Sequence, residues 1–322
     1  MERISRIDIA KGIGISLVVY GHTFSPFVEF THMFQMPLFF MLSGYLYNSK
    51  DNIKETIIKK TKSLLFPYIF FLILTNLIFV VFCRILGESY HIYPSMLIAP
   101  YGVALSLWTF IAVFIACIIF KIIDRTFDNY IYKVSAVFLC FFIGVGLYHF
   151  HIKLPFYIDS AFTIVIFYAT GYWLKKYTVI EYIIYGGFVV AVIVYALLGH
   201  LPSVDLKFNV YSDPLCLFIS CGISMFFIRL AGLLDKSNIT KSIFSYIGRM
   251  TIVILGLHIL AFEFLYLIFP RENYLAAVAV SILSIALILL VNKFVKIDVF
   301  LNKVRKIKLR TELRHIRQRI GE

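Results

Sequence analysis

An acidic, a basic and a titratable side chain interrupt the first apolar run of the chain. Asp8, Lys11 and His22 all lie within IDIAKGIGISLVVYGH. In a helix, the eleven steps from Lys11 to His22 make three turns plus about 20°, so both side chains project from one stripe, roughly 16 Å apart along the axis. Asp8 lies within about 60° of that stripe. A cation and an imidazole on one buried stripe could bind an anionic ligand and act as a general base.

Ionisable groups that face lipid cost free energy, so we expect this stripe to face a hydrated cavity lined by protein. A second interpretation stays open. Asp8 and Lys11 could extend to the headgroups at one membrane face while His22 only ends the span at the other.

Further polar residues follow in the second apolar segment, MPLFFMLSGYLYNSK. Pro37 within the run and Ser43 near its end are typical of a bent or broken helix that exposes backbone groups to a cavity. His32 and Gln35, one helical turn apart, could add polar contacts near His22. A helix-packing role for Ser43 and an interfacial position for His32 and Gln35 fit the sequence equally well.

A basic cluster, Lys59, Lys60 and Lys62, precedes the third apolar run in KETIIKKTKSLLFPY. Lysine is a common point-charge partner of phosphate, so the cluster could attract a phosphate-bearing cosubstrate. The retention of basic residues on the cytoplasmic side of membrane proteins predicts the same residues.

Two candidates occur later in the chain. Asp159 opens the sixth apolar run, where a carboxylate caps the helix N-terminus or orients a substrate hydroxyl. His258 lies within the ninth run, as a packing residue or a substrate contact. The pair His149 and His151 has no further ligand cluster nearby, so no metal site is expected.

Composition defines the elements that must position these residues. With 61% hydrophobic and 15% charged residues and a mean hydropathy of +0.87, the 322-residue chain is too apolar for a soluble domain. We predict an all-α, polytopic membrane protein with about ten transmembrane helices. The predicted spans are centred near Val18, Phe39, Ile73, Ala112, Phe141, Ile166, Val190, Ile219, Leu257 and Ile285.

Basic residues are concentrated in alternate loops, which predicts a multi-pass protein of the inner (plasma) membrane with both termini in the cytoplasm. The basic start of the chain and the first apolar run predict a retained signal anchor. Residues 1–296 form the predicted membrane domain, and residues 297–322 a basic amphipathic helix on the inner leaflet, or a solvated, frayed tail. This bias and attraction to anionic membrane lipids account for the net charge of +13 without nucleic acid.

Short motifs run in a fixed order along nearly the whole chain: D-x-x-K-G with His22 eleven residues after Lys11, PLFFMLSGYLY, clustered lysines before FPY, LW ending at Trp108, YIDSAF, YATGYWLKK, NVYSDP, and SYIGRMTIVILGLH ending at His258. Together they resemble the integral-membrane acyltransferase 3 family, particularly its fucose 4-O-acetylase-like branch of polysaccharide O-acetyltransferases. The resemblance implies a ten-helix bundle that transfers acyl groups, commonly acetyl from acetyl-CoA, to glycan hydroxyls. It also implies a glycan or lipid-linked sugar acceptor, with glycan-assembly proteins as further partners.

The family's basic residue and histidine correspond to Lys11 and His22, and its basic cluster to Lys59 and Lys62, with Lys60 between them. The resemblance therefore implies that acetyl-CoA enters from the cytoplasm, and our hypothesis is that its thioester then meets His22. Ser43 and Trp108 are further pocket candidates. Two positions differ: Lys11 stands where many members carry Arg, and Gln35 where many of this branch carry His, with His32 one turn earlier.

Two rival functions remain at this point. A glycolipid or polysaccharide transporter or flippase also needs intramembrane charge and a broken helix, although no inverted repeat is visible. A non-catalytic sensor or assembly subunit would bind neither CoA nor glycan. The absence of GxSxG, Walker A, HExxH and paired catalytic carboxylates argues against several hydrolase, NTPase and protease classes.

Overall fold

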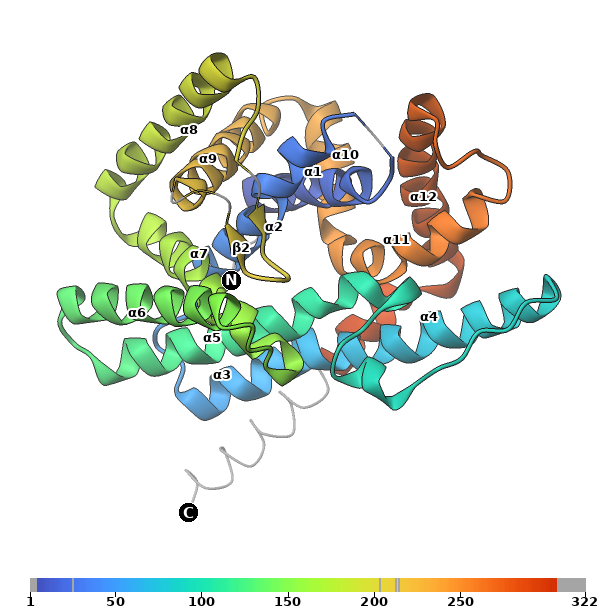
Figure 1. Ribbon diagram of the computed structural model, residues 1–322, viewed down its shortest axis with the longest axis horizontal. Coiled ribbons are helices and arrows are strands. Elements are labelled where there is room, and N and C mark those ends of the chain that lie inside the picture. Colours follow the sequence, from blue (N-terminus) through green and yellow to red (C-terminus); the bar gives the residue numbers. More distant parts are fainter. Residues whose placement is uncertain (1–4, 25, 203, 212, 214, 306–322) are drawn as a thin grey trace.

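The computed structural model describes residues 5–24, 26–202, 204–211, 213 and 215–305, and helices form almost all of its regular structure (Figure 1). The α-helices are α1 (Ser5–Gly21), α2 (Val28–Tyr45), α3 (Ile53–Lys60), α4 (Phe66–Ile85), α5 (Trp108–Thr126), α6 (Tyr130–His149), α7 (Ile158–Lys176), α8 (Thr178–Leu198), α9 (Cys216–Leu234), α10 (Asn238–Arg249), α11 (Thr251–Leu265) and α12 (Tyr274–Val295). A π-helical turn, Thr61–Leu65, joins α3 to α4, and three 3-10 helices span Pro94–Leu97, Gly102–Leu107 and Pro155–Tyr157. Strands β1 (Val204–Asp205) and β2 (Val210–Tyr211) form a short antiparallel hairpin.

Six helical stretches of the described chain are long and apolar enough to cross a membrane, so the protein is an all-helical polytopic membrane protein. They are Ile53–Ile85, Pro94–Thr126, Tyr130–His149, Val179–Leu198, Cys216–Leu234 and Tyr274–Val295. Helices α10 and α11, bent by 75° where they meet, count as a seventh if they form one span.

Hydropathy predicted ten spans, and each predicted centre does lie in a helix, but α1, α2 and α7 do not meet the length and composition of a span. These helices lie inside the bundle. Eleven of the 17 residues of α1 and twelve of the 19 residues of α7 are buried, whereas only 11% of the span in α6 is buried. A helix that contacts protein on most sides tolerates polar residues that lipid would exclude.

Glycines allow several helix pairs to pack with their backbones in contact. A Cβ at Gly171 of α7 would lie 1.9 Å from the carbonyl oxygen of Met41 in α2, and one at Gly44 of α2 would lie 1.8 Å from that of Tyr168 in α7. Gly12 of α1 and Gly248 of α10 form a similar reciprocal contact. Small residues commonly permit such close approach between membrane helices. These contacts fix α1 and α2, which carry the candidate residues of the first two segments.

The second helix is continuous. Pro37 lies inside α2, which runs without interruption from Val28 to Tyr45. Of the alternatives that Pro37 and Ser43 left open, a broken helix is therefore not observed.

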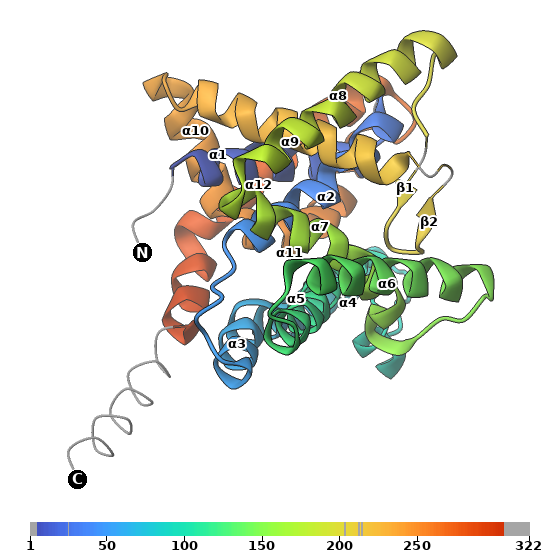
Figure 2. The same ribbon diagram turned by 90° about the vertical axis from the view of Figure 1, so that its left-hand side faces the viewer.

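The elements divide between two ends of the bundle (Figure 2). The start of α1, helix α3 and the segment after α12 lie toward one end, which we call the basic end, and the β-hairpin lies at the opposite, hairpin end. Residues 297–305 are helical and pack on the bundle: Ile297 and Leu301 are buried, and the Phe300 ring lies 5.5 Å from that of Phe70. Residues 306–322, the rest of the predicted amphipathic tail, lie outside the described residues.

Candidate active site

His22 follows directly after the last residue of α1 and keeps its ring against the final turn. Its Nδ1 lies 2.8 Å from the carbonyl oxygen of Val18. A carbonyl oxygen only accepts hydrogen bonds, so Nδ1 carries the proton and donates it. In the neutral ring the lone pair is then on Nε2. The end of α1 therefore holds an imidazole in the tautomer that a general base at Nε2 requires.

Two further histidines from distant parts of the chain lie next to His22. The ring of His258, in α11, is 5.1 Å from that of His22, centre to centre, in an edge-to-face arrangement. His258 is fully buried and its Nδ1 bonds to the carbonyl oxygens of Ile254 and Leu255, while its Nε2 has no partner among the described residues. The ring of His32, in α2, is 6.3 Å from that of His22.

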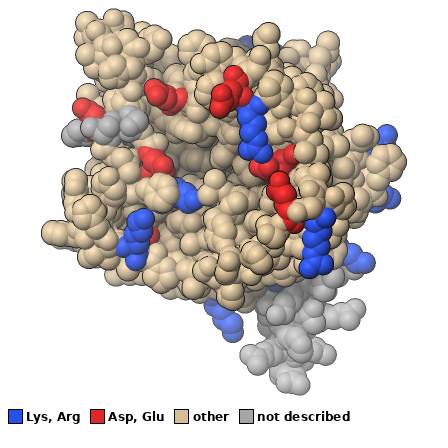
Figure 3. Space-filling model, turned by 45° about the vertical axis from the view of Figure 1, so that its right-hand side comes forward, with Lys and Arg blue, Asp and Glu red and all other residues tan. Residues whose placement is uncertain are grey.

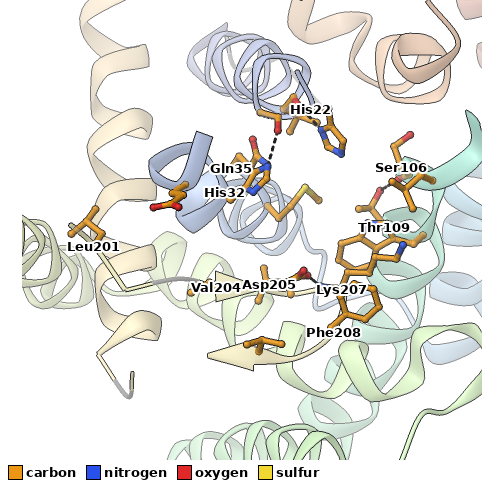
Figure 4. A pocket seen from close by; sticks show the side chains of 18 of the residues that line it. His22, His32, Gln35, Ser106, Thr109, Leu201, Val204, Asp205, Lys207 and Phe208 are labelled. Carbon is orange, nitrogen blue, oxygen red and sulfur yellow. Dashed lines mark hydrogen bonds between the residues drawn. The ribbon is translucent and has the colours of Figure 1, made fainter. Parts of the chain in front are cut away.

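His32 and Gln35 pack against the end of α1, which is one of the two positions that the sequence left open for them. The Nε2 of His32 donates to the carbonyl oxygen of Gly21 at 2.8 Å, the contact drawn in Figure 4. Gln35 is buried, and its Oε1 has no hydrogen-bond partner among the described residues. A Cβ at Gly21 would lie 2.9 Å from that oxygen, so the glycine leaves room for the Gln35 side chain in this position. A buried unpaired acceptor beside His22 is suited to a ligand hydroxyl.

These side chains border a cavity of about 880 Å³, which we call the histidine cavity. Four of the predicted residues line it: His22, His32, Gln35 and Trp108. Figure 4 shows Ser106 and Thr109 on another wall and the hairpin residues Asp205, Lys207 and Phe208 on a third. The face of the molecule in Figure 3 is hollowed near its centre, with acidic and basic side chains around the hollow.

The hairpin turn that closes this cavity is attached to α7 by two hydrogen bonds. The hydroxyl of Ser160 donates to the carbonyl oxygen of Lys207 at 2.8 Å, and the hydroxyl of Thr163 donates to Oδ1 of Asn209 at 2.7 Å. Both serine and threonine are fully buried. Partial burial lowers the pKa of Lys207, and the carboxylate of Asp205 raises it again in part. Lys207 therefore places a partly desolvated amino group at the cavity wall.

Sequence reasoning missed the hairpin's part in this cavity. Asp205, Lys207, Ser106 and Thr109 were not among the candidate residues. The motif NVYSDP, which begins at Asn209, was the available signal, because the Asn209 side chain anchors the turn.

Asp159 is buried at the start of α7, but it lines a different cavity, of about 670 Å³, beside the first. Asp159 lies in the first turn of α7, whose N-cap residue is Tyr157. Ser43 lies seven residues beyond Met36, the last residue of α2 that lines the histidine cavity, about 10 Å further along the helix. The structure therefore brings neither residue to His22.

The remaining candidates lie toward the basic end of the bundle. Lys11 is three turns from His22 along α1, and Asp8 lines a cavity of about 340 Å³ against α10, with Lys241 and Arg249. Nζ of Lys59 pairs with Asp51 at 2.7 Å, and Nζ of Lys60 lies 5.8 Å from the ring centre of Tyr168. The predicted site thus divides into a histidine group at one end and a basic group at the other.

Among the described residues, no group of three or more His, Cys, Asp or Glu side chains could hold a metal ion. The model of one protein family, described as an acyltransferase domain, matches residues 4–293. No curated protein and no solved structure matches the chain.

Proposed function

The chain belongs to the acyltransferase 3 family, whose domain covers nearly its whole length, and from this premise we propose that it transfers acetyl from acetyl-CoA to a hydroxyl of a cell-surface or lipid-linked glycan. Its activity class is acyl transfer at a membrane. The acetyl donor, the glycan acceptor and the roles of individual residues are the proposal. The observation that carries it is the ring of His22, which is fixed in one tautomer at the wall of a large cavity.

In the proposed reaction, Nε2 of His22 removes the proton of the acceptor hydroxyl while the hydroxyl oxygen attacks the thioester carbonyl carbon. The carbon–sulfur bond then breaks, the acetyl group stays on the sugar oxygen, and the CoA thiolate takes the proton from the imidazolium. In the alternative order, Nε2 attacks the thioester first and passes the acyl group to the sugar. Direct transfer needs fewer steps.

Other groups at the cavity would position the reactants. His258 is a positioning residue: its buried ring packs edge-to-face on His22, and its own Nδ1 is held by backbone carbonyls. The unpaired Oε1 of Gln35 would accept a hydrogen bond from an acceptor hydroxyl. The ammonium of Lys207 would stabilise the negative charge that develops on the thioester oxygen.

The donor is proposed to bind from the basic end, which the positive-inside rule assigns to the cytoplasm. Lys59 is already paired with Asp51, so Lys60 and Lys62 are the first candidates for the CoA phosphates. Lys11, part way along α1, lies on the route from this end to His22. The acyl arm would therefore enter the bundle beside α1 and reach the histidine cavity from the side of the basic end.

The test uses a deletion strain complemented with wild type, His22→Ala or His22→Gln, and with His91→Ala as a matched control, because His91 is an exposed loop histidine. Mass spectrometry of surface and lipid-linked glycans should show one acetyl group per modified sugar with wild type and His91→Ala only. Isolated membranes should transfer label from radioactive acetyl-CoA in the same pattern.

Each outcome has a distinct meaning. Equal acetylation in the His22 variants would remove His22 from the mechanism. Unchanged glycans together with labelled transfer to another molecule would reject the glycan acceptor. Unchanged glycans without any labelled transfer would reject acetyl transfer, and vesicle uptake of glycolipid would then favour a transporter.

A further inference from the structure

A second cavity lies beside the histidine cavity and shares a wall with it. Its volume is about 670 Å³. Lys207, Phe208 and Val210 line both cavities, so the hairpin turn is the partition between them. The ring of Tyr157, in the second cavity, is 5.7 Å from that of Trp108 in the first, so the two cavities also meet through aromatic side chains. A ligand too long for one cavity could lie over this turn and occupy both cavities.

The partition is held in a fixed position. The carbonyl oxygen of Lys207 and the side chain of Asn209 both accept hydrogen bonds from α7. Asn209 is 1% exposed, so water cannot easily replace the hydroxyl of Thr163 there. In the turn, the centre of the Phe208 ring lies 5.4 Å from Nζ of Lys153 and 5.3 Å from Nζ of Lys207. This arrangement presents an aromatic face and two cations along the shared wall.

The second cavity has the side-chain chemistry of a sugar-binding surface. Tyr101, Phe156 and Tyr157 line it together with Lys153 and the carboxylate of Asp159. Aromatic rings offer flat apolar faces, and the charged and phenolic groups offer hydrogen bonds to hydroxyls. Phe156 and Tyr157 have left-handed backbone conformations, with φ of 59° and 55°. Such conformations are costly for bulky residues and are concentrated at binding sites.

We propose that the second cavity binds sugar units adjoining the one that is acetylated, so that the acceptor is an oligosaccharide chain that lies across the Lys207–Phe208 turn. The reacting sugar occupies the histidine cavity, and its neighbours contact Tyr101 and Phe156. This inference rests on the proposed function and assigns its substrate class. It also gives Asp159 a place: its carboxylate faces the neighbouring sugars and not the reacting hydroxyl.

The experiment uses the full-length protein in vesicles, with acetyl-CoA and the protein's own unmodified acceptor pool. Surface glycan from the deletion strain is partly hydrolysed and separated by size into single sugars and oligosaccharides, and the lipid extract of the same cells is a second arm. The variants are Tyr101→Ala and Phe156→Ala, which alter two different loops. Phe150→Ala is the control, because Phe150 belongs to the same loop as Phe156, is 78% exposed and lines neither cavity.

The expected result is a higher kcat/KM for oligosaccharides than for single sugars with wild type and Phe150→Ala. In Tyr101→Ala and Phe156→Ala this ratio should fall about 3- to 10-fold, the effect of one lost aromatic contact. An equal kcat/KM for single sugars and oligosaccharides with wild type, or variants that keep the wild-type ratio, would overturn the second-cavity assignment while the proposed function stands. If no fraction or extract is acetylated, the glycan acceptor fails and this proposal fails with it. Preference for the lipid extract over free oligosaccharides of equal length would identify the chain as lipid-linked.

Discussion

Replacement of Thr163 by valine tests whether the hairpin turn is held by α7. Valine has nearly the shape of threonine, so the substitution removes one hydroxyl and leaves the packing in place. The hydroxyl donates to Oδ1 of Asn209 at 2.7 Å, and both residues are almost completely buried. In Thr163→Val that oxygen would remain buried without a donor, which costs about 1–3 kcal/mol.

The lower half of that range is expected, because the same hydroxyl also lies 2.9 Å from the carbonyl oxygen of Ser160 and cannot donate fully to both acceptors. A loss of about 1–2 kcal/mol raises the fraction of molecules with a released turn about 5- to 30-fold. The consequence is local, since it acts on residues 206–209 and not on the helices.

Limited trypsin digestion measures this release. Trypsin cleaves after Lys207, and the carbonyl of that peptide bond is held by the hydroxyl of Ser160 in the closed turn. When opening is fast relative to cleavage, the cleavage rate follows the population of the open form. Mass spectrometry of the fragment that ends at Lys207 should therefore show cleavage about 5- to 30-fold faster in Thr163→Val.

The matched control is Thr170→Val. Thr170 lies on the same helix, but its hydroxyl donates to Ile166 within α7, so the hairpin does not depend on it. An unchanged cleavage rate in Thr163→Val, or an equal increase in Thr170→Val, would refute the anchoring of the turn.

Three further predictions concern packing, charge and donor binding. Gly171→Ala should lower the stability of the detergent-solubilised protein by about 1–3 kcal/mol, because its Cβ would overlap a carbonyl of α2. The control Gly146→Ala should not, because its Cβ would meet nothing within 4 Å. Equal melting temperatures of the two variants would contradict the packing. Asp205→Asn should lower the pKa of Lys207, because the carboxylate raises it. The larger fraction of free amine should then speed the trace labelling of Lys207 by acetic anhydride near pH 8. Slower labelling would show that the carboxylate does not raise this pKa. Lys62→Gln should raise the KM for acetyl-CoA roughly tenfold and leave kcat close to wild type, and an unchanged KM in a membrane assay would move the donor site elsewhere.

The first two helices illustrate how much of the site the sequence could predict. The spacing of Lys11 and His22, and of His32 and Gln35 one turn apart in the next segment, follows from helical geometry. The structure confirms a helix in both segments, although α1 ends at Gly21, directly before His22. It also places His32 and Gln35 at the end of α1, one of the two positions that the sequence left open. The count of membrane spans was less secure, because hydropathy does not distinguish a helix enclosed by protein from one that faces lipid.

Asp159 and His258 show where sequence reasoning stopped. Both were candidates for contact with the acceptor, yet His258 lies against His22 and Asp159 lines the neighbouring cavity. Their positions depend on how α7 and α11 pack, and residues more than a hundred positions apart carry no spacing signal for that. A cavity at His22 was expected, but the second cavity and the wall that the two cavities share were absent from the prediction.

The sequence by itself determined the helical, membrane-embedded class of this protein, its family, and the residues able to do chemistry, because composition, periodicity and local motifs act within one helix or one loop. Only the tertiary structure decided which of these residues meet. The reciprocal contacts of Gly44 with α7 and Gly12 with α10 set the approach of helices far apart in the chain, and the hydroxyls of α7 fixed the hairpin between two cavities. Such contacts depend on the complementary shapes of distant surfaces, which become defined only when the whole bundle has packed.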